Sequence, residues 1–181
     1  GAPFKLATDL YFPVDGRQGA GVVTVEAESN RLMIPELATP FENLQSIILY
    51  DIDQGLSIDK ATVDFLGGPA RFSIATDLER KSVTVIGEGQ AKAEALSRWQ
   101  PMPFSPWLKG AFDYQFDLEL DRVSKLKLTS GLEQIMVGLP KPLGKAKGVA
   151  QPLGIDMSFA EQGNQFYVAY GEPGTESYLV S

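Results

Sequence analysis

The sequence predicts a mainly β protein whose antiparallel strands present one apolar and one polar face. The clearest observation is a strict two-residue alternation over residues 112–121. Successive side chains of a strand point to opposite faces, so the apolar and acidic positions of this segment lie on opposite sides. About a dozen shorter segments of similar pattern follow one another, separated by turn residues and not by regularly spaced helices, which indicates antiparallel pairing. The apolar positions of the clearest segment are Phe112, Tyr114, Phe116, Leu118 and Leu120.

The first half of the chain contains a series of expected strands, each ended by a proline or by a turn-forming stretch. Turn signals lie at Asp15-Gly16, Asp51 to Gly55, Gly67-Gly68-Pro69 and Asp77 to Lys81. Glycine and aspartate favour the backbone conformations that tight turns require. Between these signals we expect strands at residues 4–12, 22–26 with a continuation at 32–34, 44–50, 56–58, 61–65, 70–75 and 83–87.

One short helix interrupts the strands. Residues 93–99 are rich in good helix formers, and Pro101 and Pro103 follow immediately. Proline cannot continue a helix, so the segment ends there. Leu96 and Trp99 are three residues apart and therefore share one side of the helix, which we expect to be its buried side.

The second half of the chain returns to strands after the proline-rich link from Pro101 to Pro106. Residues 121–124 connect the alternating strand to a hairpin partner around Leu126 and Leu128. Residues 139–145 contain two prolines, which lack the N–H that a central strand must donate, so this stretch is expected to be a loop or a sheet edge. Further strands are expected at residues 135–137, 153–159, 166–170 and 177–180.

The composition is that of an ordered, acidic protein. Hydrophobic residues make up 44% of the 181 residues, which is enough for a real core, and the net charge is −7. Basic residues such as Lys141, Lys145 and Lys147 are scattered along the sequence. Phosphate backbones require a cationic footprint, so nucleic acid is not expected as a partner, and anionic membrane surfaces are disfavoured electrostatically. No apolar run reaches the ~20 residues of a membrane span.

Most catalytic chemistry is excluded by residue type. The chain has neither cysteine nor histidine, which removes thiol catalysis, histidine-based triads and the usual zinc or haem ligands. Carboxylates remain, and Asp113, Asp117, Glu119 and Asp121 share one strand face. Strand-spaced carboxylates diverge instead of surrounding a metal, so a solvated outer face is favoured over a calcium or acid–base site.

Two glycine-rich stretches resemble phosphate loops only superficially. Gly67-Gly68-Pro69 and Gly87-Glu88-Gly89 lack the Lys-Ser/Thr of a P-loop and the full dinucleotide fingerprint, so turns or bulges are expected. No Gly-x-Ser-x-Gly or Ser-x-x-Lys motif occurs either. The sequence therefore predicts a protein that is not an enzyme and that needs no cofactor or metal.

The apolar strand faces must be covered, and the alternation allows two solutions. In a closed sandwich or barrel, a second layer covers them and no ligand is needed. In an open or half-closed sheet, the concave face accepts a lipid, for which the aromatic-rich strand and the adaptable side chain of Met157 are suited. The pattern alone leaves both open.

Three groups of motifs carry a resemblance to a known family. The first comprises residues 21–25, 30–35, 41–44, 55–57 and the Phe65-Leu66-Gly67-Gly68-Pro69 turn, and the second comprises residues 89–91, 95–99 and 108–112. The third and most specific is Leu139-Pro140-Lys141-Pro142-Leu143-Gly144-Lys145, followed by Pro152-Leu153. Together they resemble the repeat region of YhdP-type AsmA-like proteins of the Gram-negative envelope.

This resemblance implies an extended, curved antiparallel sheet with one short helix, a half-pipe of repeated β modules, with a closed β-sandwich as the alternative. It implies a periplasmic segment of an inner-membrane-anchored protein whose anchor is not in this chain, with approximate modules 1–90 and 91–181. The implied role is to shield phospholipid acyl chains between the inner and outer membranes and to support the outer-membrane permeability barrier. The groove candidates are Phe112, Tyr114, Phe116, Leu118, Leu120, Leu153, Ile155, Met157 and Phe159.

The expected partners are a phospholipid or another acyl-chain ligand and neighbouring modules of the same chain. An excised groove also has two free edges, so the fragment is expected to self-associate or to capture lipid or detergent. The competing hypothesis is a structural or scaffolding β-domain with fully covered apolar faces, which mediates protein–protein contacts.

Overall fold

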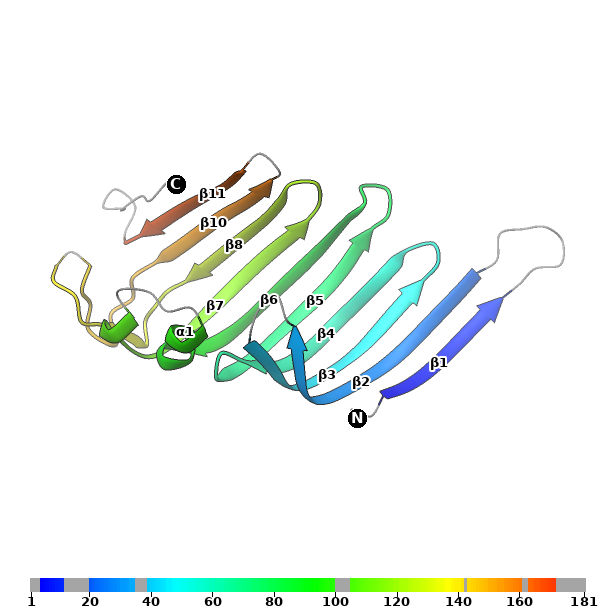
Figure 1. Cartoon of the computed structure of the whole chain (residues 1–181), viewed down its shortest axis with the longest axis horizontal. Helices are drawn as coiled ribbons and strands as arrows, with labels where there is room; N and C mark the ends of the chain where they lie inside the picture. Colours follow the sequence, from blue (N-terminus) through cyan, green and yellow to red (C-terminus); the bar gives the residue numbers. More distant parts are fainter. Residues whose placement is uncertain are drawn as a thin grey trace.

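The computed structural model describes residues 4–11, 20–34, 39–99, 105–141, 143–160 and 163–171. Ten strands form one open antiparallel sheet in the order β1-β2-β3-β4-β5-β6-β7-β8-β10-β11, and the short β9 pairs with β7 (Figure 1). The strands are β1 (Phe4–Tyr11), β2 (Ala20–Ile34), β3 (Thr39–Asp51), β4 (Gly55–Phe65), β5 (Gly68–Asp77), β6 (Ser82–Lys92), β7 (Leu108–Leu120), β8 (Ser124–Ser130), β9 (Ile135–Val137), β10 (Leu153–Ala160) and β11 (Gly163–Tyr170).

The alternating segment is the long strand β7, and its register sets the faces of its neighbours. Phe116 lies opposite Gly87 of β6 and Leu128 of β8, while Leu118 lies opposite Val85 and Leu126. Directly paired residues of antiparallel strands share a face. The apolar face of β7 therefore continues across both neighbours, as the alternation predicts.

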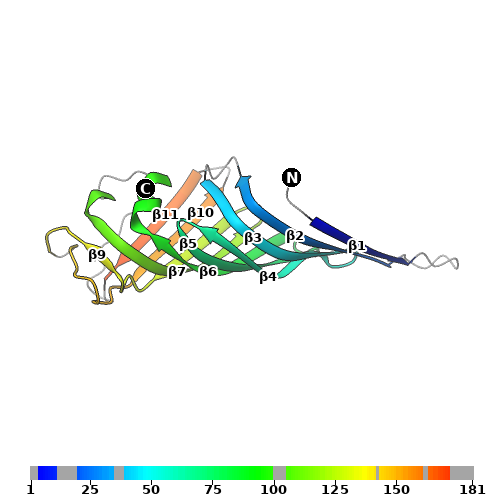
Figure 2. The same cartoon turned by 90° about the horizontal axis from the view of Figure 1, so that it is seen from below.

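The sheet is bowed into a half-pipe, and α1 (Ala93–Trp99) lies on the inner side of the curve (Figure 2). The right-handed twist of strands and local β-bulges both bend a sheet. One bulge lies in β4, where the register shifts between Ile58 and Ala61, and both Asp59 and Lys60 are exposed. A closed β-sandwich, the alternative for the fold, is therefore wrong: within the described residues the sheet is open.

The helix is confirmed with the expected bounds, Ala93–Trp99, and it packs with its expected side. The Trp99 ring meets Phe65 edge to face, with 6.1 Å between ring centroids. Phe65 in turn stacks on Phe41 of β3 at 4.7 Å. These aromatic contacts join the helix to the ends of β3 and β4 and hold it over the sheet.

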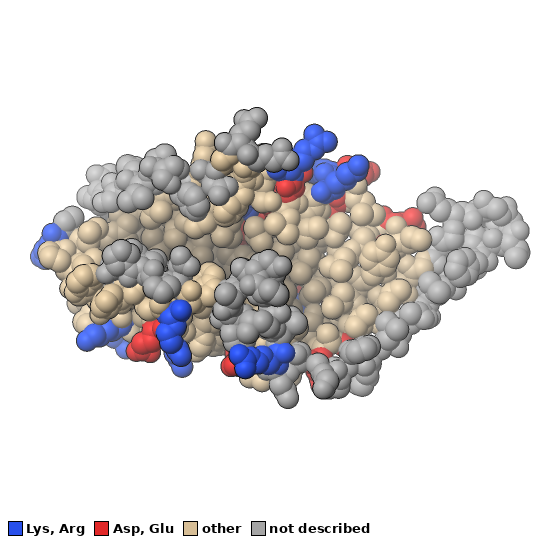
Figure 3. Space-filling view, in the orientation of Figure 1, with Lys and Arg blue, Asp and Glu red and all other residues tan. Residues whose placement is uncertain are grey.

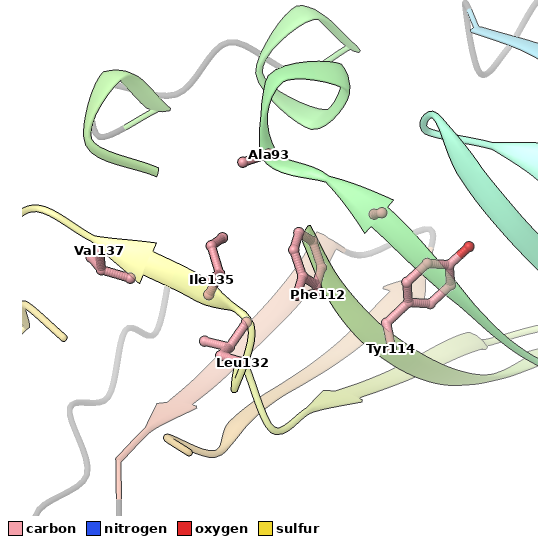
Figure 4. Close-up of a cluster of buried hydrophobic side chains, with 7 residues drawn as sticks. Ala93, Phe112, Tyr114, Leu132, Ile135 and Val137 are labelled. Carbon is pink, nitrogen blue, oxygen red and sulfur yellow. The ribbon is translucent and has the colours of Figure 1, made fainter. Parts of the chain in front are cut away.

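The main buried cluster lies where α1, β7 and β9 meet (Figure 4). Ile135 is 2% exposed and is the largest fully buried side chain among the described residues. Leu96, Leu108 and Leu139 pack around the cluster. It consists of Ala91, Ala93, Phe112, Tyr114, Leu132, Ile135 and Val137. This corner is the part of the molecule with a conventional core.

Several strands are longer than the sequence pattern predicts. Residues 22–34 belong to one continuous strand because β2 pairs with β3 along its whole length. Residues 56–58 and 61–65 are joined in β4, whose bulge explains why the alternation breaks between them. The expected strand at 177–180 lies outside the described residues. The sheet runs from β6 to β7 without interruption, so a division into modules near residue 90 stays a prediction.

A concave apolar groove

The inner face of the half-pipe is a groove lined by apolar side chains. Strand register places all nine groove candidates on the same face, since Leu126 of β8 links Leu118 of β7 to Met157 of β10. The neighbouring strands β4, β5 and β6 contribute further apolar positions to this face. Those positions include Ile58, Val63, Phe72, Ile74, Val83 and Val85.

The groove carries no charge among the described residues of β2 to β10. The Asp, Glu, Lys and Arg residues of these strands alternate onto the opposite face or lie at a strand end, except Asp59 and Lys60 in the β4 bulge, which line a hollow with the outer-face residues Arg71 and Asp117. Figure 3, which looks onto the side that bears α1, shows an uncharged expanse with acidic and basic residues along its edges. A charge-free concave surface is suited to an apolar ligand and to little else.

Two glycines of β6 keep the groove floor smooth. A Cβ atom at Gly87 would lie 2.5 Å from the Phe116 ring, and one at Gly89 would lie 2.7 Å from the Tyr114 hydroxyl oxygen. Both distances are shorter than any real van der Waals contact, so each ring lies across the glycine opposite it. Glycine in a strand often marks such a close approach. The aromatic rings thus cover the sheet instead of standing up into the groove.

The groove candidates differ in accessibility. Phe112 and Tyr114 are 8% and 7% exposed because the corner beneath α1 covers them. Phe116 and Leu118 are half-buried, and Leu120 and Phe159 are exposed. The accessible part of the apolar floor therefore lies away from the helix.

The Pro140-Lys141-Pro142-Leu143-Gly144-Lys145 string ends in a buried lysine that binds three carbonyl groups of the corner. Lys145 Nζ donates hydrogen bonds to the carbonyl oxygens of Leu132 at 2.6 Å, Ile135 at 2.5 Å and Ala146 at 3.3 Å. Burial lowers the pKa of the Lys145 amine, while the nearby Glu133 acts in the opposite direction. In the sequence Lys145 is one of several scattered lysines, because its three carbonyl partners come together only in the folded loop.

The outer face of the sheet is polar. The acidic side chains of β7 lie there, with Asp117 opposite Lys127 and Glu119 opposite Lys125 of β8. A hollow of about 1050 Å³ crosses this face, and its lining includes three pairs of polar side chains beside apolar residues such as Ala70 and Leu153. The pairs are Arg71 with Glu88, Gln90 with Asp113, and Asn43 with Asp64. No group of three or more potential metal-ligating side chains occurs in the described part of the chain.

Tyr114 makes the stability of the groove corner pH-dependent. Burial raises the pKa of Tyr114 to about 12 from 10.0, so the folded state favours the neutral phenol. The stabilisation that the neutral Tyr114 phenol gives the folded state is complete below pH 10 and is lost as the pH rises from 10 toward 12. We expect the free energy of unfolding to fall by about 2 kcal/mol over this range through Tyr114.

Urea unfolding of the parent chain and of Tyr114→Phe at several alkaline pH values measures this effect. The variant should lose less stability than the parent between pH 10 and 12, because Phe has no proton to release. Burial also raises the pKa of Tyr170, so the variant should keep some residual pH dependence. If the free energy of unfolding depended on pH identically in the two proteins, burial would not raise the pKa of Tyr114.

Comparison with known proteins shows that the chain matches one protein family. A family model described as YhdP protein matches residues 3–175. No curated protein and no solved structure matches the chain. No helix of the described residues has the length and hydropathy of a membrane span.

Proposed function

Because the chain belongs to the YhdP protein family, we propose that it is a non-catalytic envelope module whose groove shields phospholipid acyl chains during transport between inner and outer membrane. In this proposal the segment lies in the periplasm, its parent protein is anchored in the inner membrane, and neighbouring modules extend the groove. Such transport supports the permeability barrier of the outer membrane. The observation that carries the proposal is the charge-free apolar floor of the half-pipe.

The energetics favour an acyl chain over other ligands. Each methylene that leaves water for an apolar surface contributes ~0.8 kcal/mol, without any polar contact. The floor offers half-buried side chains such as Phe116, Leu118 and Ile155, whose remaining surface a chain would cover. The polar outer face meanwhile keeps the strand exteriors hydrated. The affinity of such a groove depends on the apolar area that the ligand covers and not on specific polar contacts. A transport path along which lipids move requires this kind of binding.

The absence of cysteine from the sequence allows a direct test with a single fluorescent label. Leu118→Cys places an environment-sensitive fluorophore on the groove floor, and Asp117→Cys places the same label one residue away on the outer face. Adding short-chain phosphatidylcholine below its micelle concentration should shift the emission of the first label to shorter wavelength and leave the second unchanged. Equal responses, or none at Leu118→Cys, would refute acyl-chain binding in the groove.

A further inference from the structure

The two rims of the groove, where the strands end, differ in charge. We define the α1 rim as residues 66–67, 92–99, 105–109 and the described part of 131–152, and the hairpin rim as the turns 51–55, 77–81 and 121–123. Among the described residues, the α1 rim has two acidic residues, Glu94 and Glu133, and the hairpin rim has three basic ones, Arg80, Lys81 and Arg122. The α1 rim has six basic residues: Lys92, Arg98, Lys109, Lys141, Lys145 and Lys147. The hairpin rim has five acidic residues: Asp51, Asp53, Asp77, Glu79 and Asp121.

The cations of the α1 rim are mostly exposed to solvent. Apart from the buried Lys145, each of them is exposed, and none forms an ion pair within the part of the chain that the structure describes. Arg98 Nε donates to the backbone carbonyl of Glu94, at 3.3 Å. On the hairpin rim, by contrast, Arg80 pairs with Asp77 at 3.6 Å. Although the net charge of the chain is −7, the α1 rim carries exposed cations that have no ion-pair partner among the described residues.

The hairpin rim carries a second distinguishing feature. Each of its three turns contains one exposed aliphatic side chain: Ile52 is 56% exposed, Leu78 47% and Val123 42%. Single exposed aliphatics are ordinary, but a set repeated at successive turns along one edge extends the apolar surface of the groove to that edge. The accessible floor residue Leu120 lies at the same end of β7.

From these two asymmetries we propose that the groove holds an anionic amphiphile across its width, with the anionic headgroup at the α1 rim and the chain directed toward the hairpin rim. The assignment rests on the proposed function and adds a headgroup class and an orientation to it. Unpaired Lys and Arg side chains attract a phosphate group, while the carboxylates of the hairpin rim repel it. Beyond the residues that the corner covers, from Phe116 to Leu120, β7 provides about 13 Å of accessible apolar floor for the chain.

The test compares two ligands that share one chain, dodecyl phosphate and dodecylphosphocholine, by titration calorimetry below their micelle concentrations. Three proteins are titrated. One is the parent chain, and one carries Lys92→Gln, Arg98→Gln and Lys109→Gln. The matched control carries Arg80→Gln, Lys81→Asn and Arg122→Gln, which removes the same number of positive charges from the hairpin rim. Asn is chosen at position 81 because Lys81 has a φ of 55°, a conformation that Asn tolerates.

We expect the parent chain to bind dodecyl phosphate more tightly than dodecylphosphocholine. The α1-rim variant should lose about tenfold in affinity for the phosphate, the sum of three exposed charge contacts, and should bind the phosphocholine as before. The control should resemble the parent. Equal losses of phosphate affinity in both variants would mean that net charge alone sets the affinity. No loss in either variant would mean that the α1-rim cations do not contact the headgroup. Either result would overturn the proposed orientation. Failure of the parent chain to bind either ligand would overturn the proposed function as well, so the two ideas are separable.

Discussion

Replacement of Ile135 by alanine is expected to lower the free energy of unfolding by about 3 kcal/mol. The side chain is 2% exposed and lies between α1 and the floor of the groove, in contact with the cluster that contains Phe112 and Leu132 (Figure 4). Removal of a buried isoleucine costs the transfer energy of the lost methyl and methylene groups and the energy of the cavity left behind. Chemical denaturation followed by tryptophan fluorescence measures the loss, because Trp99 is on the adjacent helix.

Ile86→Ala is the matched control. Ile86 is on β6 and is 53% exposed on the outer face of the sheet, so the same substitution there should cost less than about 1 kcal/mol. A cost at Ile86 as large as that at Ile135 would mean that the outer face is buried in solution. The corner beneath α1 would then not be the principal core.

Phe116→Asp is expected to abolish most acyl-chain binding while the sheet still forms. Its ring lies on the groove floor across Gly87 and is only half-buried, so its loss should lower stability by roughly 2 kcal/mol. A carboxylate in contact with an acyl chain must lose hydration without a partner, which should weaken dodecylphosphocholine binding about 100-fold. Circular dichroism checks the fold, and titration calorimetry measures the affinity.

Gln115→Asp places the same carboxylate one residue earlier, on the polar outer face of β7. It should leave both the affinity for dodecylphosphocholine and the far-ultraviolet spectrum unchanged. Equal loss of binding in the two variants would locate the ligand elsewhere. Complete unfolding of Phe116→Asp alone would mean that Phe116 is part of a closed core.

Local features of the fold could be predicted from the sequence because they depend on neighbouring residues. The two-residue alternation of 112–121 correctly defines a strand with one apolar face. The helix formers of 93–99, followed by prolines, define α1 with the observed bounds. Placing the nine groove candidates on one face required only the alternation within β7 and β10, together with their pairing through β8.

Features that depend on register could not be predicted in this way. Alternation specifies an apolar face but not its curvature, so it could not separate an open half-pipe from a closed sandwich. From the sequence alone, Gly87 and Gly89 were expected in turns or bulges. The pairing of β6 with β7 instead places them within a strand, beneath Phe116 and Tyr114. Lys92 and Lys109 lie at the ends of β6 and β7, and the pairing of these strands brings both residues to the α1 rim. Only long-range pairing brings such residues together.

Native mass spectrometry of the purified chain, with lipid extraction from the same sample, tests the central claim most directly. The groove account predicts phospholipid bound at defined stoichiometry, because a charge-free apolar floor left open to water by the described residues gains free energy when an acyl chain covers it. It also predicts that the Phe116→Asp protein carries less lipid than the Gln115→Asp protein. A monomer of the bare protein mass, with no extractable lipid, would contradict the account and favour a scaffolding domain.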